Sequence, residues 1–168
     1  LSYSRFICEN EGIRGEQTLF IPREAGSEDP VEIFDVKITN LSGKVRSLSV
    51  FGYVEFSFHE IDMDNQNFQM SLYAAGSHYE NDAVLCELHY EQNAWQFLAG
   101  NFKPDGFDGV REAFIGPYRT ERNPLGVETG KLSGYLELGG NPCGALQFIA
   151  ELKPGEQATA AFLLGQKN

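Results

Sequence analysis

Side chains that can hold a sugar or a phosphate gather within one irregular stretch of the sequence, residues 105–144. Tyr118, Arg119, Glu121 and Arg122 lie there among glycines and prolines, which interrupt helices and strands. The guanidinium of arginine forms a planar fork that binds phosphate or carboxylate, and a tyrosine ring can stack on a sugar. A long loop with such residues is typical of a binding site or an interface. We therefore single out Tyr118, Arg119 and Arg122 as candidate sugar or phosphate contacts.

A structural role for the same loop is the simpler interpretation. One of the two arginines would then pair with a nearby carboxylate and fix the loop. The carboxylates that suit this role are Glu121, Glu128 and Asp105. In this interpretation Tyr118 is a core residue that anchors the loop.

A second polar segment, residues 62–69, reads DMDNQNFQ. Its acidic and amide side chains suggest a calcium loop, but Asn67 stands where such a loop needs glycine and Tyr73 where it needs glutamate. Amide and carboxylate groups also bond to neighbouring hydroxyls of a sugar. The segment is therefore either a solvated connection or a sugar-binding loop.

The single tryptophan, Trp95, lies in a segment where aromatic and other residues alternate. It could serve as a carbohydrate platform. Aromatic residues at alternate positions of a strand more often belong to the core, so both interpretations of Trp95 stay open.

Other kinds of chemistry find little support. His59, His78 and His89 lack the spacing of metal ligands, and no GxSxG nucleophile motif or glycine-rich phosphate loop occurs. The net charge of −11 argues against nucleic acid or an anionic membrane as a partner, and no apolar run approaches the roughly 20 residues that span a bilayer. Three scattered cysteines without a CxxC pair, and no signal peptide, predict reduced thiols in the cytoplasm and neither metal nor cofactor.

Short strands must position these candidates. The clearest alternation of apolar and polar residues, over 46–58, predicts a half-buried antiparallel strand in which Gly52 marks a bulge or close packing. We also expect a hairpin tip over Ser77–Asp82, a helical turn within 107–114 and a turn at Pro154–Gly155. The other expected strands are 3–8, 17–21, 31–38, 70–75, 83–90, 94–99, 132–138, 145–152 and 158–164. This pattern predicts one all-β domain, an antiparallel β-sandwich with at most one or two short helical turns.

Several motifs resemble one family of sugar-processing enzymes. They are YSRF at 3–6, NQNFQMSLY at 65–73, FIGPYR at 114–119, NPL at 123–125 and GGNPCGALQ at 139–147. Over essentially the whole chain, they resemble the N-terminal domain of cellobiose phosphorylases, in family 94 of the glycoside hydrolases.

The resemblance implies a super-sandwich fold and a role within a larger enzyme. In that family a helical linker joins the sandwich to an (α/α)6 barrel with the catalytic aspartate. Inorganic phosphate is the nucleophile that converts cellobiose, with inversion, into α-glucose 1-phosphate and glucose. Residues 1–168 would then be a single sandwich domain, a fragment that lacks linker and barrel and is inactive alone.

The resemblance also implies partners. The family's enzymes are homodimers in which a segment similar to Asn67, Phe68 and Gln69 approaches the partner subunit's active site. We therefore expect a β-glucoside disaccharide or cello-oligosaccharide, a second subunit and the rest of the polypeptide as partners. Two alternatives stay open, a free-standing carbohydrate-binding module and a purely structural dimerisation domain.

Overall fold

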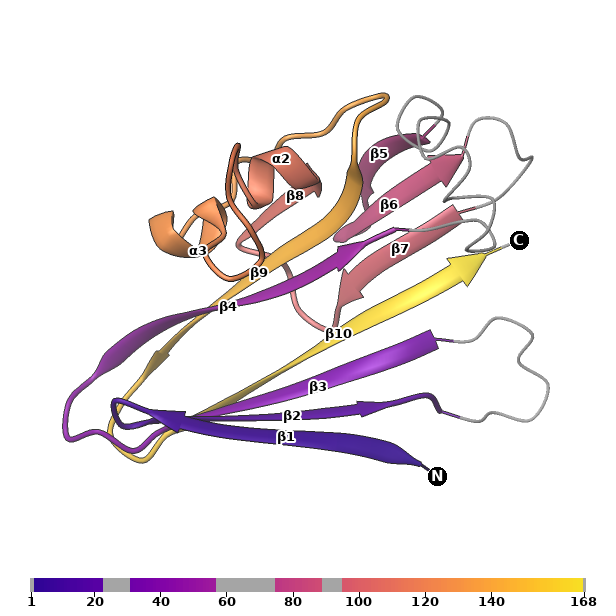
Figure 1. Ribbon diagram of the computed structural model, residues 1–168. Helices are drawn as coiled ribbons and strands as arrows, with labels where there is room; N and C mark the ends of the chain where they lie inside the picture. The colour runs from indigo at the N-terminus through magenta and orange to yellow at the C-terminus, as the bar shows by residue number, and fades with distance from the viewer. Residues whose placement is uncertain (1, 23–30, 57–74, 89–94, 168) are drawn as a thin grey trace.

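The chain folds almost entirely into β-strands. The structure is a computed structural model that describes residues 2–22, 31–56, 75–88 and 95–167 (Figure 1). Its strands are β1 (Tyr3–Asn10), β2 (Ile13–Phe20), β3 (Val31–Asn40), β4 (Arg46–Glu55), β5 (Ala75–Glu80), β6 (Ala83–Leu88), β7 (Trp95–Gly100), β8 (Gly106–Val110), β9 (Pro142–Leu152) and β10 (Gln157–Lys167). Two helices of about one turn are α2 (Arg111–Phe114) and α3 (Leu125–Thr129).

The strands form two antiparallel sheets of unequal width. The large sheet has the order β1-β2-β3-β10-β7-β6-β5, and the small sheet has the order β4-β9-β8. Figure 1 shows the small sheet lying over one part of the large one, with both helices on the side of the small sheet that faces away from it. The predicted all-β super-sandwich with short helical turns is confirmed.

The main core lies between the sheets. Side chains alternate along each strand, so β7 and β10 direct Leu98, Phe162 and their neighbours toward β9 and β4. Gly52 of β4 permits this close packing, because a Cβ there would lie 2.3 Å from the ring of Phe162. The predicted close approach at Gly52 is therefore confirmed.

One side of the sandwich is closed by residues 132–139, which bond to both sheets in turn. Gly134 N–H donates to Phe107 C=O (2.8 Å) at the edge of the small sheet. Farther along, Gly139 N–H donates to Ala75 C=O (2.7 Å) at the edge of the large sheet. The strand predicted over 132–138 is therefore wrong. Its apolar residues alternate as in a strand, but its backbone crosses from one sheet to the other, and only Leu138 forms an isolated bridge, with Gly76.

The side chain of Asp108 holds the first half of this crossing segment. Asp108 is buried, with 1% of its surface exposed. Its Oδ1 accepts hydrogen bonds from Ser133 Oγ (2.5 Å), Ser133 N–H (3.1 Å) and Tyr135 N–H (3.1 Å). Three donors compensate a buried carboxylate for the water it has lost. The small sheet and the crossing segment are therefore joined through a buried carboxylate that is bonded to two surface residues.

The turn signals were only partly correct. Asn81 and Asp82 have φ of 51° and 61° and form a two-residue hairpin turn, whereas Ser77–Glu80, predicted as part of the tip, belong to β5. The helical turn predicted within 107–114 begins only at Arg111, because residues 106–110 pair with β9 as β8. The turn at Pro154–Gly155 is confirmed between β9 and β10.

Replacing Gly109 by alanine should destabilise the closed side. A Cβ at Gly109 would lie 2.6 Å from Ser77 and 2.7 Å from Leu136, so either the strand or the crossing segment must shift. We expect Gly109→Ala to lower the free energy of unfolding by about 1–3 kcal/mol, measured by urea denaturation. Gly43→Ala is the matched control, since a Cβ at Gly43 meets nothing within 4 Å. Equal unfolding midpoints for the two variants would contradict this account.

Candidate functional site

The loop that connects α2 and α3 is anchored at both ends. Phe114, the last residue of α2, stacks on Tyr53 of β4 with ring centroids 4.7 Å apart. The next residue, Ile115, is fully buried, and its C=O accepts a hydrogen bond from Leu125 N–H (2.9 Å) where α3 begins. Residues 116–124 therefore form a loop with fixed ends on the outer side of the small sheet.

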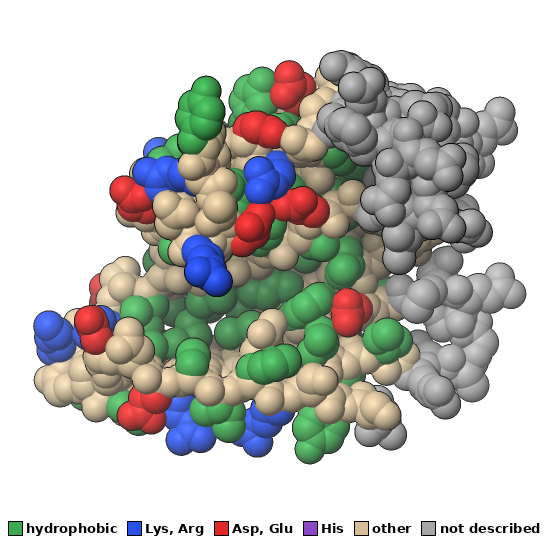
Figure 2. Space-filling model, in the orientation of Figure 1, with side chains coloured by type: hydrophobic (Ala, Val, Ile, Leu, Met, Phe, Trp, Pro, Cys, Tyr) green, Lys and Arg blue, Asp and Glu red, His purple; other side chains and the backbone are tan. Residues whose placement is uncertain are grey.

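Arg111 connects this loop to β4. Its Nε donates to Glu55 Oε1 (2.9 Å), and its Nη2 donates to Glu121 Oε1 (2.7 Å). Tyr53 Oη donates to the same oxygen of Glu55 (2.6 Å). The two carboxylates raise the pKa of Arg111. The pKa of Glu121 is lowered by a hydrogen bond from the backbone of Glu121 itself and by the hydrogen bond from Arg111. Figure 2 shows acidic and basic side chains next to one another in this region of the surface.

Arg119 has a second anchoring role. Its Nη1 forms an ion pair with Glu128 of α3 and also donates to Asn123 C=O (3.2 Å). This is one of the pairings that the sequence suggested for the arginines. The pair raises the pKa of Arg119 and lowers that of Glu128. Because the guanidinium already bonds within the loop, its first role is to fix the loop.

Tyr118 lies outside the core, so its predicted role as a core anchor is wrong. Its side chain is fully exposed, at 108% of the reference surface, and its backbone φ is +60°. A residue with a Cβ rarely adopts that conformation, because the Cβ crowds the backbone. Gly116, two residues earlier, also has a positive φ, of 88°. The loop therefore holds an aromatic ring in solvent on a strained backbone, a combination often found at functional sites.

Arg122 is exposed in the same loop as Tyr118, and side chains fix the turn between these two residues. Asn123 Oδ1 accepts hydrogen bonds from Thr120 N–H and Thr120 Oγ1, both at 3.3 Å. Arg122 N–H donates to Thr120 Oγ1 (3.4 Å). The side chains of Arg111, Arg119 and Asn123 thus hold the loop, while those of Tyr118 and Arg122 project from it. Such a surface can stack on a ring and pair with an anion.

The other predicted residues lie elsewhere. Asn67, Phe68 and Gln69 fall in the segment 57–74, outside the described residues. Trp95 is half-buried on the outer face of the large sheet, with its ring centroid 5.8 Å from that of His78. It is separated from Tyr118 by the whole sandwich, so the two aromatic residues do not form one platform.

Sequence reasoning missed Arg111 and Glu55, which organise the loop. Arg111 lay inside the predicted helical turn, and Glu55 lay 56 residues earlier on a predicted strand. Arg111 pairs with Glu55 because α2 packs over β4, and a pattern of neighbouring residues in the sequence cannot predict that packing. The one available signal was the excess of carboxylates near 105–128, and it suggested the wrong arginine for Glu121.

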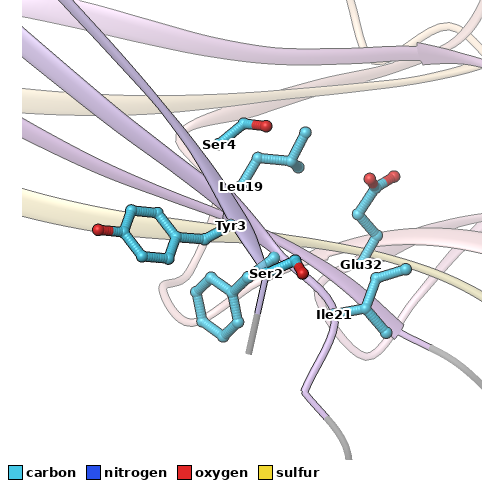
Figure 3. A pocket seen from close by; sticks show the side chains of 7 residues that line it. Ser2, Tyr3, Ser4, Leu19, Ile21 and Glu32 are labelled. Atoms are coloured by element: carbon cyan, nitrogen blue, oxygen red, sulfur yellow. The ribbon is translucent and has the colours of Figure 1, made fainter.

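A pocket of about 580 Å³ opens at the ends of β1, β2 and β3 (Figure 3). Glu32 is its one charged side chain among the described residues, and the others are Ser2, Tyr3, Ser4, Leu19, Phe20 and Ile21. This mixture lacks paired carboxylates, a nucleophile with a base, or an anion-binding cation. The described ranges also contain no group of three His, Cys, Asp or Glu placed to bind a metal ion, and no helix there is long and apolar enough to cross a membrane.

Comparisons with known proteins cover the whole chain. The family described as "Glycosyl hydrolase 94, supersandwich domain" matches residues 1–168. An N,N'-diacetylchitobiose phosphorylase from Vibrio proteolyticus is 45% identical over 168 residues, and one from Vibrio furnissii is 44% identical; each match covers 98% of this chain and 20% of that protein. A solabiose phosphorylase from Paenibacillus borealis is 30% identical over 98% of this chain and 21% of its own length. The chain therefore spans about a fifth of the length of these relatives.

A solved structure supports the fold alone. A polysaccharide lyase superposes with a TM-score of 0.51 at 17% sequence identity, over 96% of this chain and 21% of the lyase.

The Arg119–Glu128 pair predicts how the loop responds to acid. Because the pKa of Glu128 is lowered, the pair stabilises the loop above the ordinary carboxyl pKa of about 4.3 and is lost as pH falls through the lowered value. We expect the carboxyl ¹³C resonance of Glu128 to titrate with a midpoint below that of an ordinary glutamate, and this midpoint to rise in Arg119→Gln. Backbone resonances of residues 117–123 should shift over the same pH range in the wild type. An unchanged midpoint in Arg119→Gln would show that the ion pair does not form in solution.

Proposed function

This chain belongs to the supersandwich domain family of glycosyl hydrolase family 94, and from that membership we propose that it is the N-terminal, non-catalytic domain of a disaccharide phosphorylase. The observation that supports the proposal best is the 98% coverage of this chain by disaccharide phosphorylases that are about five times as long. The parent enzyme would transfer a glycosyl group from a disaccharide to inorganic phosphate.

The proposed reaction needs no cofactor. An oxygen of phosphate forms a bond to the anomeric carbon, while the bond from that carbon to the bridging oxygen breaks. The departing sugar takes a proton from a general acid, and the products are a sugar 1-phosphate and a free sugar. We propose that the anomeric configuration inverts and that the acid lies outside this chain.

For the substrate we propose a β-linked disaccharide of N-acetylglucosamine. The relatives at 45% and 44% identity are named for N,N'-diacetylchitobiose. Cellobiose, which the sequence motifs suggested, is the second candidate. The two disaccharides share the same β-1,4 linkage and differ at C2, where an acetamido group replaces a hydroxyl.

The chain would contribute scaffold and contacts. We propose that Asn67, Phe68 and Gln69 border the active site of a second subunit in a homodimer. We also propose that Tyr118 and Arg122 contact sugar, phosphate or the protein surface around that site. What supports this is the rigid loop that projects both side chains while Arg119 and Arg111 hold its base.

A carbohydrate-binding module is the second candidate function, because Tyr118 is a fully exposed ring of the kind that stacks on sugars. A module of this kind would bind an oligosaccharide without any other domain. Calorimetric titration of the 168-residue chain with cellotetraose and with chitotetraose separates the two functions, since a scaffold gives no heat of binding with either sugar.

The parent enzyme should prefer the acetamido sugar. We expect kcat/KM for N,N'-diacetylchitobiose to exceed that for cellobiose by at least about 100-fold, measured as sugar 1-phosphate formed from each disaccharide and phosphate. The 168-residue chain, assayed as the control, should form none. A higher kcat/KM for cellobiose would show that the proposed substrate is wrong. Turnover by the 168-residue chain alone would show that this domain is catalytic.

Substitution of Tyr118 should separate function from stability. Asparagine tolerates a positive φ better than tyrosine, so Tyr118→Asn should leave the free energy of unfolding unchanged or raise it by up to about 1 kcal/mol. If the ring contacts substrate or partner, kcat/KM of the parent enzyme should fall about tenfold, corresponding to a loss of about 1.4 kcal/mol. Tyr118→Phe, which retains the ring, should keep most of the activity. Full activity in Tyr118→Asn would exclude a contact role.

A further inference from the structure

The two long sides of the sandwich differ in how they end. On one side, residues 132–139 bond to the edges of both β8 and β5 and close the gap between the sheets. On the other side, the small sheet ends at β4, while the large sheet continues through β3 and β2 to β1. Since β4 packs on Phe162 of β10, the strands β1–β3 extend beyond it (Figure 1). Among the described residues, part of their inner face therefore has no strand opposite it, whereas Ile13 of β2 and Ile38 of β3 share a core cluster with Leu48 of β4.

An apolar groove of about 280 Å³ lies where the large sheet extends beyond β4. It runs between β4 and the inner face of the large sheet, and Figure 2 shows apolar side chains lining the cleft between the two layers. The residues lining it are Gln17, Phe34, Val36, Phe51, Gly52, Tyr53, Val54, Leu98 and Phe162. Farther out on the same face, Phe6 of β1 is 61% exposed. A face of this composition is normally covered in a folded protein.

The edge of β4 that borders the groove has unpaired backbone groups. Phe56, the residue after β4, donates its N–H to Pro142 C=O (3.4 Å), so even-numbered residues of β4 direct their backbone groups toward β9. Gln147 lies opposite Phe51, and its C=O points away from β4, since it accepts a hydrogen bond from Asp105 N–H (2.9 Å). The backbone groups of Phe51 therefore point away from β9. The backbone groups that point away from β9, along the free edge of β4, are therefore those of Ser47, Ser49, Phe51, Tyr53 and Glu55, and of these residues Phe51 and Tyr53 line the groove. Among the described strands, none pairs with this edge.

We infer that the groove receives an added β-strand, which pairs with the free edge of β4 and covers the exposed part of the inner face of β1–β3. Such a strand would bond to the free N–H and C=O groups of β4 and direct alternate apolar side chains onto Phe34, Val36 and Phe6. A long, apolar strand edge without a partner promotes aggregation, and an added strand prevents this by pairing with the edge. The strand belongs to the remainder of the polypeptide, an assignment that rests on the proposed function.

A second copy of this chain does not fit the same edge. Antiparallel pairing between two β4 strands requires a two-fold axis perpendicular to their sheet. That axis places both large sheets on the same side of the joined small sheets. Because β1–β3 extend past β4 on that side in each copy, the two sets of strands would occupy the same space. A single strand lacks this extension and therefore fits where a second copy of the chain does not.

The length of the relatives provides a source for this strand. They are about five times as long as this chain, so four-fifths of such a polypeptide lies outside it. A strand supplied in the same polypeptide meets the edge at a high effective concentration, which favours its pairing over that of a separate molecule. An apolar groove suits a permanent contact, because permanent interfaces are more apolar than transient ones.

Hydrogen exchange tests this inference residue by residue. In the intact polypeptide, we expect the amides of Ser47, Ser49, Phe51 and Tyr53 to exchange at least about 100-fold more slowly than in the 168-residue chain. The amides of Leu48, Val50 and Val54, which face β9, should be protected in both samples and serve as the internal control. Since the readout is protection and not turnover, it does not depend on which disaccharide the enzyme uses, or on whether it is a phosphorylase.

Each other result overturns the inference. Rapid exchange of the four odd-numbered amides in the intact polypeptide, with their even-numbered neighbours protected, would show that the edge stays open. Protection already present in the 168-residue chain and independent of its concentration would place the partner strand inside this chain. Protection that appears only at high concentration would identify a second copy as the occupant. The measurement on the intact polypeptide decides the question even if the shorter chain does not fold.

Discussion

The buried carboxylate of Asp108 is the contact on which the shape of this domain depends. A carboxylate removed from water is tolerated only when donors replace the lost hydration, and Ser133 and Tyr135 supply three of them. By holding the start of the crossing segment, Asp108 directs the rest of it toward β5, where Glu137 N–H donates to Ser77 Oγ (3.1 Å). Gly109 follows Asp108, and its lack of a side chain lets Ser77 and Leu136 approach. One side of the sandwich is thereby closed without another strand.

This closure makes the two sides unequal and gives the domain distinct surfaces. On the closed side, residues 132–139 bond to the edges of β8 and β5, whereas on the open side no described strand pairs with the outer edge of β4 and part of the inner face of β1–β3 is uncovered. A third surface, the outer side of the small sheet, is covered by α2, and the loop with Tyr118 rises from it. The open side is suited to a permanent apolar contact, and the loop is suited to a polar contact with a ligand or a second protein.

Local patterns in the sequence predicted the strands well because alternation reports burial directly. The alternation over 46–58 corresponds to β4, and Gly52 was placed correctly at a close approach. The same rule failed at 132–138, where alternating apolar residues face the two sheets in turn while the backbone bonds to each sheet only briefly. Ser77 was misjudged because a polar residue in a run of polar residues suggests a turn, although its hydroxyl bonds to the crossing segment. Such contacts join residues about 60 positions apart, beyond the reach of any local pattern.

In the candidate site too, the sequence identified the types of residue but could not predict their contacts. Composition alone identified Tyr118, Arg119 and Arg122, yet it could not say which would be used inside the loop. The structure commits Arg119 to Glu128 and leaves the ring of Tyr118 in solvent on a backbone that disfavours it. A loop selected for stability alone would place glycine or asparagine at that φ, because either relieves the crowding. Tyrosine at this position, with ion pairs fixing the backbone around it, is therefore a choice that stability does not explain and that the proposed contact role would explain.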